Sequence, residues 1–294
     1  MTLASGTRRP LPPWARAVGR NPAVLVSTLI LVGVFVSAVF APILAPYDPT
    51  DQHLEARLIP PAWSPAGTPR HVLGSDALGR DLLSRIIYGS RISLIVGFAA
   101  VAVQGTMGGV LGLLAGYLGG RVDAVIMRIA DVQLAVPFFV LAIAIMSVLG
   151  PGLRNMIIVL GISGWVIYCR VVRSQVLSVR ELDYVEAARA IGGKYPRIIF
   201  RHVLPNVLSS FLVISTLEVA RMIISEASLS YLGLGVQPPT PTWGGMVADG
   251  RNWVMTSWWV STLPGIAIFA TVLAVNVLGD FLRDWLDPTL RLRE

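Results

Sequence analysis

Six apolar runs, each close to the length of a membrane-spanning helix, constrain this sequence more than any other feature. A bilayer core requires about 20 consecutive apolar residues in a helix, and backbone groups in lipid must be paired within closed structures such as helices. Only 14% of the 294 residues are charged, whereas 54% are hydrophobic. We therefore predict an all-α, polytopic membrane protein with six transmembrane helices. The expected spans lie at about 23–44, 92–114, 134–149, 156–168, 207–224 and 260–278.

Arginine and lysine residues are divided unevenly between the segments that connect these runs. Sixteen lie in segments that would share a side with the N-terminus, and seven lie in the others. Because cytoplasmic segments are enriched in Arg and Lys, we expect both termini in the cytoplasm. The expected segments are a cytoplasmic tail at 1–22, a first transmembrane helix at 23–44, an external loop at 45–91, the main transmembrane domain at 92–283 and a cytoplasmic tail at 284–294.

The second apolar run carries glycine at four-residue intervals, at Gly108, Gly112 and Gly116. In a helix this spacing places the three glycines on one face. Small residues in such a stripe allow helices in a membrane to approach closely. We therefore expect another helix to pack tightly against this face.

Between the fourth and fifth runs lies the hydrophilic sequence EAARAIGGKYPRIIFRHVLP, which begins with Glu186 and ends with Pro205. Asp183 and Glu186 have the spacing of a capping box at a helix N-terminus, and Gly192 permits a left-handed stop. Pro196 suits the first turn of a second short helix, which Pro205 is expected to end. The sequence thus predicts two short helices joined at a glycine hinge, an arrangement suited to filling a groove in another protein.

This hydrophilic segment, at about 183–205, resembles the EAA loop of ABC importer permeases. In that family the loop docks on a cytoplasmic ATPase subunit. The resemblance implies a type I ABC importer permease fold over 92–283, with a cytoplasmic coupling-helix loop. The residues that it assigns to the ATPase-coupling loop are Glu186, Ala187, Ala188, Gly192, His202, Leu204 and Pro205.

Two further segments are similar to the signature of dipeptide and oligopeptide permeases. They are LGSDALGRDLLSRIIYGSRISL at 73–94 and LSYLGLGVQPPTPTWGGMVADGRN at 229–252. An N-terminal span followed by a long external loop further resembles the C-type subunit of such a permease pair. The external motif residues are Gly74, Asp76, Gly79, Arg80, Asp81, Arg85 and Arg91.

The resemblance implies one half of a heterodimeric pore that imports di- or oligopeptides across the bacterial plasma (inner) membrane, driven by ATP hydrolysis in other subunits. Expected partners are a second homologous permease subunit, one or two cytoplasmic ABC ATPase subunits, an extracellular or periplasmic substrate-binding protein, the peptide and membrane lipid. Two alternatives stay open: the same importer class carrying nickel or another small solute, and an ion-coupled secondary transporter.

No catalytic set is visible in the sequence. A P-loop requires a Gly-Lys pair followed by Ser or Thr, but the single lysine, Lys194, precedes Tyr195. We therefore expect no enzyme activity and no cofactor in this chain, with ATP and Mg bound by the partner ATPase subunits. The three histidines His53, His71 and His202 lack metal-ligand spacing, and no basic stripe with interleaved aromatic residues indicates nucleic acid.

Glu218 and Arg221 lie one helical turn apart inside the fifth apolar run. Charges at membrane depth are costly unless they are paired or face water. We expect these two side chains to face the bundle interior or the pore and to interact with each other or with the partner subunit. The alternative is a buried pair that only fixes helix register.

Overall fold

The structure is a computed structural model, and it describes residues 21–286. The tails predicted at 1–22 and 284–294 therefore lie almost entirely outside the described residues. Within 21–286 the chain is helical, without strands, and a single β-bridge joins Ser75 to Asp81. In chain order the helical elements are α2 (Pro22–Val39), α3 (Ala41–Leu44), η1 (Leu54–Ala56), α4 (Leu82–Leu118), α5 (Gly120–Leu134), α6 (Phe138–Leu149), α7 (Leu153–Arg180), α8 (Asp183–Ala190), α9 (Tyr195–Ile198), η2 (Ile199–Val203), α10 (Leu204–Tyr231), α11 (Trp243–Gly250), η3 (Arg251–Trp253) and α12 (Trp259–Leu286).

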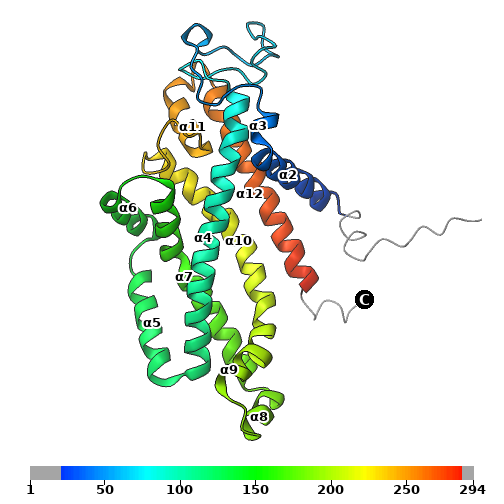
Figure 1. The fold of residues 1–294 in the computed structure, drawn as a ribbon, viewed down its shortest axis with the longest axis vertical. Helices are drawn as coiled ribbons and strands as arrows, with labels where there is room; N and C mark the ends of the chain where they lie inside the picture. The colour runs from blue at the N-terminus through cyan, green and yellow to red at the C-terminus, as the bar shows by residue number, and fades with distance from the viewer. Residues whose placement is uncertain (1–20, 287–294) are drawn as a thin grey trace, which may run out of the picture.

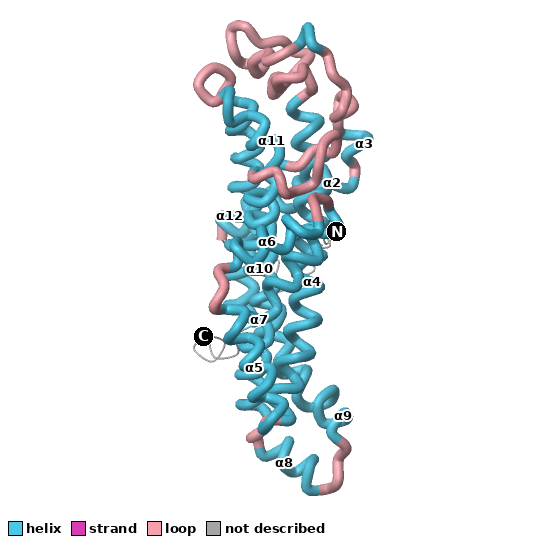
Figure 2. Tube along the Cα trace, turned by 90° about the vertical axis from the view of Figure 1, so that its left-hand side faces the viewer, coloured by secondary structure: helices cyan, strands magenta, loops and turns pink. Residues whose placement is uncertain are grey.

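The helices form an elongated bundle whose two ends differ (Figure 1). At one end, residues 45–81 fold into a loop-rich unit beside α11, which we call the cap. At the opposite end, residues 183–203 carry the short helices α8 and α9, and we call them the distal loop. Figure 2 shows that the connecting loops gather mainly at these two ends, with helix between them.

Among the described residues, five helices are long and apolar enough to cross a membrane, and a bent pair can supply the sixth span. The five are 22–39, 82–118, 153–180, 195–231 and 259–285. The run predicted at 134–149 consists of α6 and the break before it, and α6 meets α5 at an angle of 86°. The break contains Pro137, which has no backbone N–H and restricts the residue before it. The prediction of an all-α membrane fold is confirmed, with its third span in broken form.

Helix α4 begins earlier than hydropathy predicted. Asp81 is its N-cap and accepts a hydrogen bond from the Ser84 backbone N–H (2.8 Å). The segment 82–91, assigned to an external loop, is therefore helical. Its charged residues Arg85 and Arg91 lowered the apparent hydropathy, although both side chains are paired in the structure.

The glycine stripe of α4 packs against α7, as predicted for a close helix pair. A Cβ atom added at Gly108 would lie 2.2 Å from the carbonyl oxygen of Trp165, and one at Gly112 would lie 2.6 Å from that of Cys169. Both distances are shorter than any normal contact, so only glycine permits this approach. The partner of the stripe is thus a helix of the same chain.

Candidate functional site

The distal loop consists of two short helices joined by glycines. Gly192 has φ +83°, and its N–H donates to the Arg189 carbonyl oxygen (3.0 Å), while the Gly193 N–H donates to that of Ala188 (3.0 Å). These two bonds form a Schellman motif, which ends a helix in the left-handed conformation. The predicted glycine stop is confirmed.

The capping box predicted at the start of this loop is wrong. Leu182 is the N-cap of α8 and makes no side-chain capping bond, while Asp183 is already the first helical residue. The acidic side chains of Asp183 and Glu186 thus lie in the first turn. There they interact favourably with the positive end of the helix dipole, so the sequence signal for a helix start was sound but displaced by one residue.

Pro205 does not end the second helix, contrary to the prediction. The chain passes from α9 through the π-helical segment Ile199–Val203 into α10, and Pro205 lies in the first turn of α10. A π turn widens a helix and so accommodates a proline that cannot donate a backbone hydrogen bond. The Asn206 side chain donates to the His202 carbonyl oxygen (2.6 Å) at this point.

The predicted coupling residues lie on one continuous stretch but differ in exposure. Glu186, Ala187, Gly192 and Pro205 are exposed, whereas Ala188, His202 and Leu204 are half-buried. The loop is held by a small buried cluster of Val185, Ile198 and Val203 against the valines of α7 and α10.

Two apolar side chains of the distal loop remain uncovered: Ile191 is 88% exposed and Phe200 is 67% exposed. The sequence analysis did not select either residue. Their apolar character within a hydrophilic segment was a signal that could have identified them. Both side chains are available for contact with another protein.

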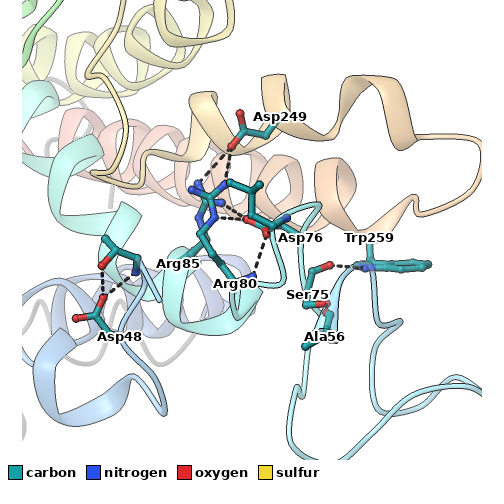
Figure 3. Close-up of polar contacts among 10 residues, drawn as sticks. Asp48, Ala56, Ser75, Asp76, Arg80, Arg85, Asp249 and Trp259 are labelled. Atoms are coloured by element: carbon teal, nitrogen blue, oxygen red, sulfur yellow. Dashed lines mark hydrogen bonds and ion pairs between the residues drawn. The ribbon is translucent and has the colours of Figure 1, made fainter. Parts of the chain in front are cut away.

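A network of two acids and two arginines joins the cap to α4 and α11 (Figure 3). Arg80 Nε lies 2.7 Å from Asp76 Oδ2, and Arg85 Nη1 contacts the same oxygen. The Nη2 atoms of both arginines lie 3.3 Å from Asp249 Oδ2. Asp76, Arg80 and Arg85 are each less than 7% exposed, whereas the Asp249 side chain is 46% exposed. The network therefore joins the cap loop, α4 and α11 through three buried side chains and one that reaches solvent.

Charge neutralisation inside the network shifts the titration of Asp76. Burial alone would raise the pKa of this carboxyl group, but the charges of Arg85 and Arg80 act in the opposite direction. The backbone N–H groups of Arg80 and Leu78 also donate to it. The pKa of Asp76 is therefore below its usual range, which means that the carboxylate is held ionised.

The structure brings together six of the seven external motif residues. Gly74 and Gly79 adopt positive φ angles of 85° and 75°, which lets the chain turn back on itself. Asp81 accepts from Ser84 and contacts His71 Nδ1 at 2.9 Å. Arg91 is separate, because its guanidinium donates to the carbonyl oxygens of Ala38 and Val39 at the end of α2.

The cap also depends on residues outside the predicted external motif set. Asp249 completes the arginine network from α11. Trp243 is 1% exposed, and its indole Nε1–H donates to the Ile86 carbonyl oxygen (2.9 Å). The Trp259 indole N–H donates to the Ser75 carbonyl oxygen (3.2 Å). The contacts of Asp249 and Trp243 join 229–252 to 73–94, the two segments that carried the resemblance, and that of Trp259 joins α12 to the same cap.

Glu218 and Arg221 form the expected pair. Glu218 is 4% exposed; its Oε1 lies 3.3 Å from Arg221 Nη1, and its Oε2 accepts from Gln104 Nε2 (3.4 Å). The Arg221 side chain is 46% exposed, and its guanidinium lies 5.1 Å from the Phe138 ring centroid. The acid thus faces α4 inside the bundle, while the cation lies at the break between α5 and α6.

The architecture resembles solved structures of ABC transporters. It is similar to a chain of a methionine ABC transporter in an inward-facing conformation (TM-score 0.52, 19% identity, 69% of this chain and 96% of that one). It is also similar to an amino acid ABC transporter crystallised with histidines (TM-score 0.53, 16% identity, 68% and 94%). At these identities the likeness concerns the fold, which is that of type I ABC transporter permeases.

The sequence places it in a family. The family model described as binding-protein-dependent transport system inner membrane component matches residues 108–292, and that of the N-terminal TM domain of oligopeptide transport permease C matches 13–61. The chain belongs to the binding-protein-dependent transport system inner membrane component family. It is therefore a multi-span inner-membrane transport component of a bacterial ABC importer, and the secondary-transporter alternative is set aside.

Curated relatives match nearly the whole chain. The di/tripeptide transport system permease protein DppC of Pseudomonas aeruginosa is 44% identical over 96% of this chain and 93% of its own length. The dipeptide transport system permease protein DppC of Escherichia coli is 43% identical, with coverage of 96% and 94%. The probable D,D-dipeptide transport system permease protein DdpC of Escherichia coli is 41% identical over 91% and 88%.

Proposed function

We propose that this chain is one of two different permease subunits of an ABC importer for di- and oligopeptides. The observation that carries the proposal is the agreement among relatives at 41–44% identity, whose names all specify short peptides. The segments 73–94 and 229–252, which first suggested a peptide permease, fold against each other at the cap end of the bundle. Both are therefore parts of one structural unit.

In this proposal the distal loop is cytoplasmic and couples the permease to a separate ATPase subunit. Its two short helices are joined by the Schellman motif at Gly192, and its outer surface exposes Ile191 and Phe200. An apolar projection of this kind suits insertion into a cleft of a partner. ATP and Mg are bound by the ATPase subunits, whose closure moves the loop and with it the spans.

The cap is then external, and both termini are cytoplasmic. A cavity of about 580 Å³ opens beside the cap, between the end of α10, the loop 232–242 and α11, and it is lined by Arg85, Asp249, Arg251 and Asn252 among others. We assign the docking of the external substrate-binding protein to this end. Rigid attachment of the cap to α4 and α11 allows that docking to act directly on two helices.

Reconstitution of the complete complex in proteoliposomes tests the proposal. The chain, its second permease subunit, its ATPase subunits and its binding protein should together give ATP-dependent uptake of a labelled dipeptide. Uptake of nickel or of another small solute in preference to peptides would overturn the peptide assignment and support the alternative cargo. A membrane-impermeant thiol reagent should label a cysteine introduced at Leu54 in the cap, and not one introduced at Ile191, in intact cells.

A further inference from the structure

The break between α5 and α6 interrupts a candidate membrane span and is flanked by two cavities. A cavity of about 440 Å³ is lined by Pro137, Phe138, Phe139, Leu217, Ile224, Ser225 and Arg221, among others. A smaller one of about 170 Å³ shares Pro137, Phe138 and Arg221 and extends to Ser163. Non-helical backbone within a membrane span is tolerated where it lines a cavity. The shared residues make the break a common wall of both spaces.

Arg221 places a positive charge in both cavities. Its one ion pair, to Glu218, is long at 3.3 Å, which leaves most of the guanidinium N–H groups available. Glu218 itself is buried and also accepts from Gln104, so the cation is the more accessible member of the pair. A half-exposed arginine in a membrane-spanning helix must face water, a ligand or another subunit, because contact with lipid is costly.

Ser163 adds a second polar group that lacks a partner. It is 8% exposed, and its Oγ has no hydrogen-bond partner among the described residues. Buried hydroxyl groups are normally paired, so this one has capacity for a ligand in the smaller cavity. Phe138 begins α6 after Pro137, which provides no side-chain cap, so the positive end of that helix dipole also borders the site.

We propose that Arg221 of α10 and Ser163 of α7, which lie beside the N-terminus of α6, form a subsite midway through the membrane. This subsite would bind the terminal carboxylate of the transported peptide. The inference rests on the proposed function and deepens it. The charges available there are cationic, and a guanidinium pairs with a carboxylate through two parallel hydrogen bonds. The larger cavity, with Phe139, Leu217 and Ile224 in its wall, accommodates the rest of a short peptide. Glu218 is a positioning residue that holds Arg221 toward the break.

Thiol protection in the purified complex tests the subsite without the binding protein, which has its own specificity. Phe139, which is 41% exposed and lines the larger cavity, is replaced by cysteine in a Cys169→Ala background. The rate of its modification is measured against increasing alanyl-alanine and against its C-terminal amide. Loss of a hydrogen bond to a charged group weakens binding by about tenfold or more. We expect the dipeptide to protect the thiol at concentrations at least tenfold lower than the amide.

Arg221→Gln should abolish this preference for the free carboxylate, and Ser163→Ala should reduce it. The double variant Glu218→Gln/Arg221→Gln, which leaves no unpaired buried carboxylate, should behave as Arg221→Gln does. Arg170→Gln is the matched control, because Arg170 is a half-exposed arginine of α7 whose ion pair is with Asp131 (2.6 Å). It should retain the preference.

The proposal is overturned if the dipeptide and the amide protect equally, or if Arg221→Gln weakens both to the same extent. It is also overturned if Arg221→Gln releases the second permease subunit on co-purification, since Arg221 would then contact that subunit. Uptake in proteoliposomes distinguishes a failure of the subsite from a failure of the proposed function. If the complex transports peptide but the thiol is not protected, the subsite alone is wrong; if it transports no peptide, the proposed function fails and the subsite fails with it.

Discussion

The cap and the distal loop lie at opposite ends of the same bundle and are stabilised in different ways. In the cap, Asp76, Arg80 and Arg85 are buried and paired with one another and with Asp249. The distal loop has a small apolar cluster inside and leaves Ile191 in solvent. The cap is thus largely completed by contacts within the chain, whereas the distal loop offers contacts that only another protein can complete.

This difference determines what a substitution should do at each end. A buried ion pair contributes little relative to apolar packing, but removal of one partner is strongly destabilising because a buried charge remains. An exposed apolar side chain contributes little to folding, and its removal affects binding instead. Substitutions in the cap should therefore change stability, and those in the distal loop should change assembly.

The largest effect is expected from Asp76→Ala. It leaves the buried guanidinium groups of Arg80 and Arg85 with only the half-exposed Asp249, and removal of one buried partner typically costs about 3–5 kcal/mol. Thermal unfolding of the purified complex should show this loss. Asp48→Ala is the control, because the Asp48 side chain is exposed and bonds only to Thr50. Equal melting temperatures for the two variants would contradict the structural role of the network.

The second prediction compares one glycine from each end. Gly79 and Gly192 have similar positive φ angles of 75° and 83°. A Cβ at Gly79 would lie 1.7 Å from the His53 carbonyl oxygen, whereas one at Gly192 would meet nothing within 4 Å. Gly192→Ala should cost about 1–2 kcal/mol, from the left-handed conformation alone, and Gly79→Ala about 3 kcal/mol, because overpacking is added.

Unfolding in denaturant, followed by a probe in each region, measures both variants. Both variants have the cost of placing alanine in the left-handed conformation. The difference between their losses in free energy of unfolding is therefore the cost of overpacking at Gly79. Similar losses for the two variants would show that the cap loop relaxes around a side chain. The cap would then be less rigid than its contacts with His53 indicate.

Local signals in the sequence predicted much of this fold. Apolar length gave the spans, and the stop at Gly192 was predictable because the Schellman motif needs a residue that tolerates positive φ. The capping box failed by one position because acidic residues are favoured both at the N-cap and in the first turn. The helix through Pro205 was missed because a π turn depends on how the chain packs and not on a local pattern.

The candidate sites were less predictable because they depend on distant residues. Asp249 lies 164 residues from Arg85 in the sequence, and no spacing rule connects them. Glu218 and Arg221 were found because charge in an apolar run is conspicuous. The cavity beside them depends on Phe138 and Ser163, which belong to other helices, and neither has a distinctive sequence context.

A third prediction concerns assembly at the distal loop. Ile191→Ser and Phe200→Ser should leave the melting temperature of the permease unchanged and weaken its association with the ATPase subunits. Apolar anchors in an interface contribute about 2 kcal/mol or more, or roughly 30-fold in affinity. Co-purification at graded ATPase concentrations measures the effect. Leu54→Ser is the matched control, because Leu54, at 69%, is about as exposed as Phe200 but lies in the cap. Loss of ATPase binding in this variant would contradict the assignment of the two ends.

The smallest effect is a pH dependence confined to the cap. The arginine charges overcome the effect of burial and lower the pKa of Asp76 in the folded protein, while the same carboxyl in the unfolded chain titrates near its ordinary value of about 3.9. A lowered folded-state pKa means that the unfolded state binds the proton first, so the contribution of Asp76 to stability is fully present above about pH 5 and declines as the pH falls toward the folded-state pKa. Between pH 6 and 8 this group should contribute no pH dependence, because it is ionised in both states. The melting temperature of the wild-type protein should therefore fall more steeply between pH 5 and 3 than that of Asp76→Asn, which has no carboxyl to protonate. Parallel curves for the two proteins would mean that the acid sensitivity arises elsewhere in the chain, and that the arginines of the cap do not depend on the charge of Asp76.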